Sequence, residues 1–203
     1  SLAINWMDEH IPAIVNAWYP GEAGGTAVAE VLFGDYNPGG KLPLTYYRSL
    51  DELPAFDDYD IRKGRTYQFF EGNPLYAFGH GLSYTTFDIS KGRLNKKTIS
   101  AGQGLNFKVN VKNTGKYDGA EVIQVYVRKV DDTEGPIKSL RAFRRVPLKA
   151  GETCVVSIDL LPTTFEFFDP TTNTMRIMPG KYEIMYGNSS DIPSGNKLSV
   201  TLR

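Results

Sequence analysis

The stretch "VNVKNTGKYDGAEVIQVYV" (109–127) decides the fold of most of this chain. Apolar and polar residues alternate on both sides of the segment "NTGKYDG" (113–119), which is rich in turn-forming residues. Strict alternation is the pattern of a strand with one buried face, and glycine and aspartate mark the turn between two such strands. The sequence therefore predicts two consecutive β-strands here.

The same two-residue period recurs over the C-terminal half of the chain. Its core-facing positions are Leu105, Phe107, Val109, Val111, Ile123, Val125, Val127, Val156, Ile158, Leu160, Tyr182, Ile184, Tyr186, Leu198, Val200 and Leu202. Turn signals separate the runs at "KAGE" (149–152), "DPTTN" (169–173) and "MPGK" (178–181). Short strands at this spacing, with no helical pattern between them, predict an immunoglobulin-like or fibronectin III-like antiparallel β-sandwich over residues 87–203.

The N-terminal residues show a different hydrophobic pattern, which is typical of an α/β fragment. Residues 2–10 resemble the end of a helix, and "IPAIVNAW" (11–18) resembles a short buried strand. Residues 25–33 have helical periodicity, and Gly34 is expected to end that helix. A single buried strand needs neighbours that residues 1–47 do not supply, so we expect these residues to be the remnant of a larger α/β domain.

Residues 48–86 lack a clear period and form a long linker or junction between the two regions. Loops of this length are usually functional or packed over another surface. Five aromatic residues lie between Tyr67 and Phe78, which favours packing. The expected organisation is a remnant at 1–47, a linker at 48–86 and a sandwich at 87–203, so the fold class is mainly β.

Composition excludes several kinds of protein. The 203 residues carry a formal net charge of zero, and 41% of them are hydrophobic, which is typical of a globular chain. A neutral chain without a basic excess is not expected to bind nucleic acid or a membrane surface. The single cysteine, Cys154, lies in a strand pattern and is expected to be structural.

Local motifs for chemistry are weak. "GDYNPGGK" (34–41) departs from a phosphate-binding loop in its spacing, and Leu42 stands where that loop needs a hydroxyl. The acidic run Asp57, Asp58 and Asp60 is better explained as a solvated loop than as a catalytic carboxylate pair. Neither histidine has neighbours at metal-ligand spacing, so no metal or cofactor is expected. Glu22 follows the predicted strand, where ligands of open α/β sheets bind, and is a weak candidate for substrate proximity.

Four segments together resemble the C-terminal part of glycoside hydrolase family 3, which contains β-glucosidases and β-xylosidases. They are "AWYPGEAGGTAVAEVLFGDYNPGGKLPLTY" (17–46), "PLYAFGHGLSYTTF" (74–87), "VNVKNTGKYDGAEVIQVYV" (109–127) and "LRAFRRVPLKAGET" (140–153). The resemblance covers nearly the whole chain in order. The segment "GRTYQFF" (64–70) is most similar to the β-xylosidase branch.

The resemblance implies retaining hydrolysis of terminal β-linked sugars by an aspartate nucleophile and a glutamate acid/base. Both belong to parts of the family that lie upstream of the matching segments, so no catalytic residue is assigned here and the chain alone is expected to be inactive. Its substrate partner would be an oligosaccharide bound through the upstream domains. Arg65 and Tyr67, in a loop that could reach the sugar site, are weak candidates for substrate proximity.

The resemblance favours a periplasmic or secreted location. Self-association is expected if the N-terminal remnant exposes apolar surface. The alternative is a free-standing fibronectin-like module for carbohydrate binding or adhesion, since fold does not determine function.

Overall fold

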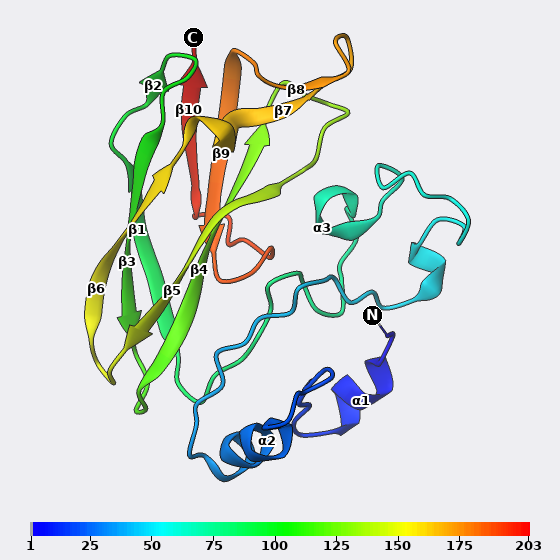
Figure 1. Cartoon of the computed structure of the whole chain (residues 1–203), viewed down its shortest axis with the longest axis vertical. Helices are drawn as coiled ribbons and strands as arrows, with labels where there is room; N and C mark the ends of the chain where they lie inside the picture. Colours follow the sequence, from blue (N-terminus) through cyan, green and yellow to red (C-terminus); the bar gives the residue numbers. More distant parts are fainter. Residues whose placement is uncertain (1) are drawn as a thin grey trace.

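The structure is a computed structural model that describes residues 2–203. Its C-terminal part is a β-sandwich, and its N-terminal helices lie beside one end of that sandwich (Figure 1). One sheet has the order β1-β3-β6 and the other the order β2-β10-β9-β4-β5. These strands are β1 (Phe87–Leu94), β2 (Thr98–Ile99), β3 (Leu105–Asn113), β4 (Gly119–Lys129), β5 (Ser139–Leu148), β6 (Thr153–Leu160), β9 (Gly180–Gly187) and β10 (Lys197–Leu202).

Neighbouring strands of the sandwich pair antiparallel, except that β2 pairs parallel with β10. A separate antiparallel pair, β7 (Glu166–Asp169) and β8 (Thr174–Ile177), follows the short 3-10 helix η2 (Pro162–Phe165). The predicted fold class, a mainly β chain with an antiparallel sandwich, is confirmed.

The core of the sandwich consists of the alternating residues that the sequence indicates. Phe107, Val109, Ile123 and Val125 are completely buried, and they pack in one cluster with side chains from both sheets. Burying one such side chain stabilises a fold by about 1.5–3 kcal/mol. Removing these apolar faces from water is therefore what holds the two sheets together.

The N-terminal part contains α1 (Asn5–His10) and α2 (Gly24–Phe33). Helix α2 ends as expected at Gly34, whose left-handed backbone (φ 84°) directs its N–H to the Val31 carbonyl. The predicted buried strand at residues 11–18 is wrong, because this segment forms no strand and is exposed throughout. An extended segment needs a neighbouring strand for its backbone hydrogen bonds, and none is present beside it in the described part of the chain.

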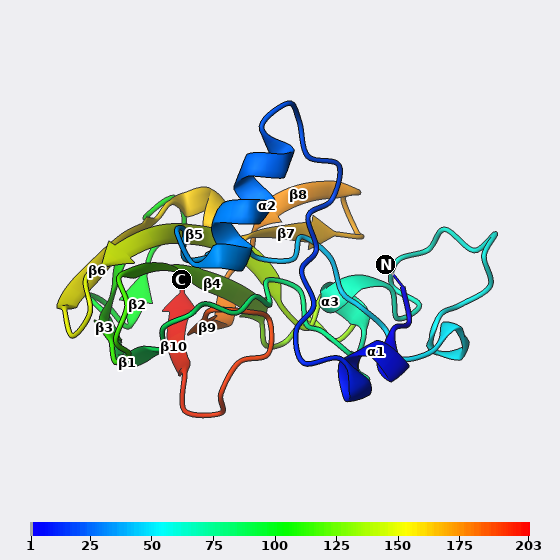
Figure 2. The same cartoon turned by 90° about the horizontal axis from the view of Figure 1, so that it is seen from below.

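The linker carries η1 (Leu50–Glu52) and α3 (Thr66–Phe69), and it crosses the space between the helices and the sandwich (Figures 1 and 2). Residues 42–46 and 75–80 run antiparallel as a two-stranded ribbon. The Leu42 N–H donates to the His80 carbonyl, and the Tyr46 N–H donates to the Tyr76 carbonyl. No helix among residues 2–203 has the length and apolar character needed to cross a membrane.

Candidate functional site

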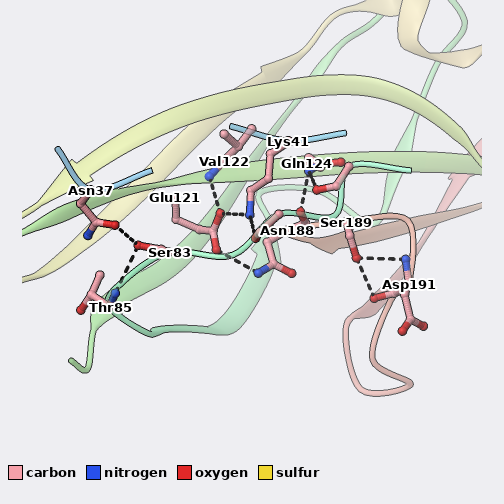
Figure 3. A network of polar contacts seen from close by, with 12 residues as sticks. Asn37, Lys41, Ser83, Thr85, Glu121, Val122, Gln124, Asn188, Ser189 and Asp191 are labelled. Atoms are coloured by element: carbon pink, nitrogen blue, oxygen red, sulfur yellow. Dashed lines mark hydrogen bonds and ion pairs between the residues drawn. The ribbon is translucent and has the colours of Figure 1, made fainter. Parts of the chain in front are cut away.

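A nearly buried ion pair joins the segment just before the linker to the sandwich. Lys41 Nζ lies 2.8 Å from Glu121 Oε1, and the two side chains are 12% and 6% exposed. The ammonium also donates to the Gly81 carbonyl at 2.9 Å (Figure 3). Charges removed from water to this degree persist only when their remaining hydrogen-bonding capacity is satisfied.

The Glu121 carboxylate connects further segments at the same point. Its Oε2 accepts from the Asn188 amide at 2.9 Å, and its Oε1 accepts from the Val122 N–H at 2.7 Å (Figure 3). One carboxylate therefore binds the segment before the linker through Lys41, strand β4 through the Val122 N–H, and the loop after β9 through Asn188.

Gln124, three residues after Glu121 on β4, makes a second connection. Its amide nitrogen donates to the Gly79 carbonyl at 3.2 Å and to the Asn188 carbonyl at 2.6 Å. Its amide oxygen accepts from the Tyr126 hydroxyl. Burial raises the pKa of Tyr126, so this phenol remains a hydrogen-bond donor at neutral pH.

An aromatic contact anchors helix α3 to the sandwich. The Tyr67 ring stacks on Phe78 at 4.2 Å and meets the edge of Tyr126 at 5.7 Å. Its hydroxyl accepts the Leu140 N–H at 3.1 Å. The linker aromatics are therefore packed, as their number in the sequence indicates.

His80 is the last residue of the ribbon. Its ring stacks on Tyr76 at 5.2 Å, and the Tyr76 hydroxyl donates to Asp8 Oδ1 at 2.6 Å. Burial, and then the charge of Lys41, lower the pKa of His80. Burial, and then the bond to Asp8, raise the pKa of Tyr76 to about 12, so it stays protonated.

A pocket of about 480 Å³ opens at this junction. Its wall consists of residues from the linker at 45–48 and 67–80, together with Lys138 and the segment 189–191 after β9. Lys138 donates from Nζ to the Ser190 carbonyl at 2.6 Å, and burial lowers its pKa. The pocket is therefore formed by the same contacts that join linker and sandwich.

The three residues proposed to lie near substrate occupy different places. Glu22 is exposed in the turn before α2. Arg65 directs its guanidinium to the Asp58 and Ala55 carbonyls at 3.0 and 2.8 Å, so it folds the loop on itself. Tyr67 lines the pocket, and its hydroxyl is engaged by β5. No hydrogen bond or ion pair joins any two of these three side chains.

Two of the three acidic residues in the loop, Asp58 and Asp60, are paired with basic neighbours. Asp58 Oδ2 lies 2.6 Å from Lys63 Nζ, and Asp60 Oδ2 lies 2.8 Å from an Arg62 guanidinium nitrogen. The hydrogen bond from Lys63 lowers the pKa of Asp58, and that from Arg62 lowers the pKa of Asp60 to about 2. Neither carboxyl is suited to hold a proton near neutral pH, as a general acid must.

Sequence reasoning missed the residues that build the junction. Glu121 had a detectable signal, because it lies in the two-residue register of Ile123, Val125 and Val127, where a charge needs a partner. Lys41 had no such signal, because its partner is 80 positions away. Among residues 2–203, no group of three or more His, Cys, Asp or Glu side chains could hold a metal ion.

Comparison with known families matches both parts of the chain. Residues 1–84 match the glycosyl hydrolase family 3 C-terminal domain, and residues 121–190 match the fibronectin type III-like domain. Among solved structures, a β-glucosidase from Erythrobacter marinus is 38% identical with a TM-score of 0.82, over 97% of this chain and 26% of that one. A Listeria innocua β-glucosidase in complex with glucose is 28% identical with a TM-score of 0.82, over 99% of this chain and 29% of that one.

Curated relatives agree with these matches. A xylan 1,4-beta-xylosidase of Xylanibacter ruminicola is 49% identical over 100% of this chain and 23% of its own length. A periplasmic beta-glucosidase of Salmonella typhimurium is 38% identical over 93% of this chain and 26% of its own length. The chain thus spans about a quarter of the length of these relatives.

The fold and the order of the two matched domains define the C-terminal portion of a glycoside hydrolase. The chain belongs to glycoside hydrolase family 3.

Proposed function

We propose that this chain is the non-catalytic C-terminal portion of a retaining β-glycosidase that releases terminal β-linked sugars, with β-xylosides favoured over β-glucosides. The observation that carries the proposal is the ordered match of two family 3 domains along one chain. The preference for xylosides rests on the 49% identity to a xylan 1,4-beta-xylosidase. The catalytic carboxylates would belong to upstream domains, which would also bind the oligosaccharide, and the chain alone would be inactive. No nucleic-acid or membrane partner is proposed.

The contacts at the junction support a role for this chain in holding the domains of the enzyme together. The Lys41–Glu121 pair fixes the segment before the linker on the sandwich, and the Gln124 amide fixes the linker itself at Gly79. From this anchored base the loop at 51–65 extends away from the body of the molecule (Figure 2). Its aromatic side chains Phe56 and Tyr59 are 94% and 85% exposed. We therefore place this loop at the rim of the sugar site, where flat aromatic rings would contact a sugar.

A chimeric enzyme tests the proposal. The region of the Xylanibacter ruminicola xylosidase that this chain matches is replaced by the chain, and hydrolysis of aryl β-xyloside and β-glucoside is measured. We expect the chimera to turn over the xyloside faster, and the 203-residue chain alone to show no turnover. Hydrolysis by the chain alone would contradict a non-catalytic role.

The same chimera tests the rim. Replacing Phe56 and Tyr59 by alanine should raise KM at least about fivefold with little change in kcat, because the loss of even one aromatic contact removes about 1 kcal/mol of binding. Phe143→Ala is the matched control, since Phe143 is an exposed aromatic on β5. An unchanged KM in the double variant would contradict the position of the loop at the rim.

A further inference from the structure

The pocket at the linker–sandwich junction has the properties of a ligand site in its own right. We propose that it binds one neutral pyranose-sized sugar. Its volume of about 480 Å³ lies within the range of about 300–1,000 Å³ that is usual for small-molecule pockets.

Polar groups around the pocket have unused hydrogen-bonding capacity. The Lys138 ammonium has three N–H groups, of which one is directed to the Ser190 carbonyl. Among the described residues, no hydrogen bond engages the ring nitrogens of His80 or the side chains of Arg48 and Asn73. These groups offer both donors and acceptors, which is the complement that sugar hydroxyl groups require.

The charges around the pocket balance. Arg48 and Lys138 contribute two positive charges, and Glu71 and Asp191 contribute two negative ones. Burial lowers the pKa of His80, which favours its neutral imidazole. A pocket without net charge favours an uncharged ligand over a phosphate or a carboxylate.

Apolar surface completes the wall. The rings of Tyr67, Phe70 and Tyr76 line the pocket together with Pro74 and Leu75. A pyranose carries hydroxyl groups around its edge and C–H groups on its faces. A wall that combines aromatic rings with donors and acceptors can therefore contact both parts of one sugar.

This inference goes beyond the proposed function, because it concerns binding by the 203-residue chain itself. The test is a titration of the isotope-labelled chain with methyl β-xyloside and methyl β-glucoside, followed by amide NMR. We expect saturable shifts confined to residues 45–48, 71–77 and 189–191, with a Kd on the order of 1–10 mM for a ligand of this size.

Two variants and a control make the test specific. Arg48→Ala and Lys138→Met should each raise Kd at least about threefold. Lys112→Met, which removes an exposed charge from β3, should leave Kd unchanged. Because Arg48 is exposed and makes no side-chain bond in the described chain, its variant should keep the parent spectrum.

Three outcomes would overturn the proposal. They are shifts that do not saturate by ~100 mM sugar, equal binding by Arg48→Ala and the parent, and tighter binding of glucuronate than of the neutral glucoside. Each leaves the hydrolysis test of the chimera unaffected, so failure of the pocket and failure of the proposed enzyme role are distinguishable.

Discussion

At the scale of single residues, Glu121 is a nearly buried charged side chain. Its carboxylate is withdrawn from water and holds Lys41, Asn188 and its own strand together. A buried charge that loses its partner costs far more than a surface charge does. Loss of this one carboxylate is therefore expected to destabilise the junction.

Glu121→Gln should lower the free energy of unfolding by about 3 kcal/mol, because Lys41 would remain largely buried without its counter-charge. Urea unfolding measures the change. The control is Glu183→Gln, whose pair with Lys197 is longer, at 3.7 Å, and more exposed. That control should cost less than about 1 kcal/mol. Equal effects of the two variants would contradict a special role for Glu121.

His80 should make the stability depend on pH. Its pKa is lower in the folded chain than its ordinary value of 6.5, so the unfolded chain takes up a proton at higher pH than the folded one. Stability is therefore fully present above pH 6.5, falls as the pH drops below this value, and levels off below the folded-state pKa. Lys41, Asp8 and Asp191 are the charged groups that face the ring.

Unfolding measured between pH 7.5 and about 5 tests this dependence. His80→Phe should flatten the acid slope, because phenylalanine keeps a ring against Tyr76 and takes up no proton. His10→Phe, at the other and exposed histidine, is the matched control. A parent-like slope in His80→Phe would assign the pH dependence to other groups.

At the scale of elements, the ribbon formed by residues 42–46 and 75–80 decides how the linker lies. Just beyond the ribbon, the backbone at Gly81 passes close to that at Gly40. A β-carbon added at Gly81 would collide with the Gly40 carbonyl oxygen, which is backbone and cannot rotate away. A β-carbon at Gly40 would meet nothing within 4 Å.

Gly81→Ala should therefore destabilise the chain by about 1–3 kcal/mol, the usual cost of forcing extra volume into a packed contact. Gly40→Ala should change stability by less than about 0.5 kcal/mol. Hydrogen exchange of the Leu42 and Tyr46 amides reports the same effect locally, and it should speed up only in Gly81→Ala. Equal exchange in both variants would contradict the close approach.

At the scale of the whole molecule, the two ends of the chain differ in how much apolar surface they bury. The sandwich encloses its core between two sheets. The N-terminal part leaves large apolar side chains in water, and these are Trp6, Ile11, Ile14, Val15, Trp18, Tyr19, Leu32 and Phe33. Such a surface favours association with another apolar surface.

We therefore expect the 203-residue chain to self-associate as its concentration rises. Sedimentation velocity should show a shift from monomer to larger species, whereas residues 37–203 should remain monomeric because they keep the sandwich and the junction. Leu32→Ser with Phe33→Ser, on the exposed end of α2, should weaken the association. A monomeric parent chain at high concentration would contradict the expectation.

The sequence predicts the features that depend on neighbouring residues, and it does not predict those that depend on distant ones. Alternation at Val109 and Ile123 predicts their strands, and Gly34 predicts the end of α2, because strand faces and helix ends depend on neighbouring residues. Residues 11–18 have a strand composition but form no strand, because a strand also needs a hydrogen-bonded neighbour.

Local patterns in the sequence predict the sandwich, its strands and the resemblance to family 3, because each depends on a repeating period or a continuous motif. The folded chain is needed to show that Lys41 pairs with Glu121, that Tyr67 binds β5, and that the linker and the segment after β9 enclose a pocket. These contacts join residues far apart in the chain. Their energies arise from burial and charge pairing after the chain has folded, so no local pattern encodes them.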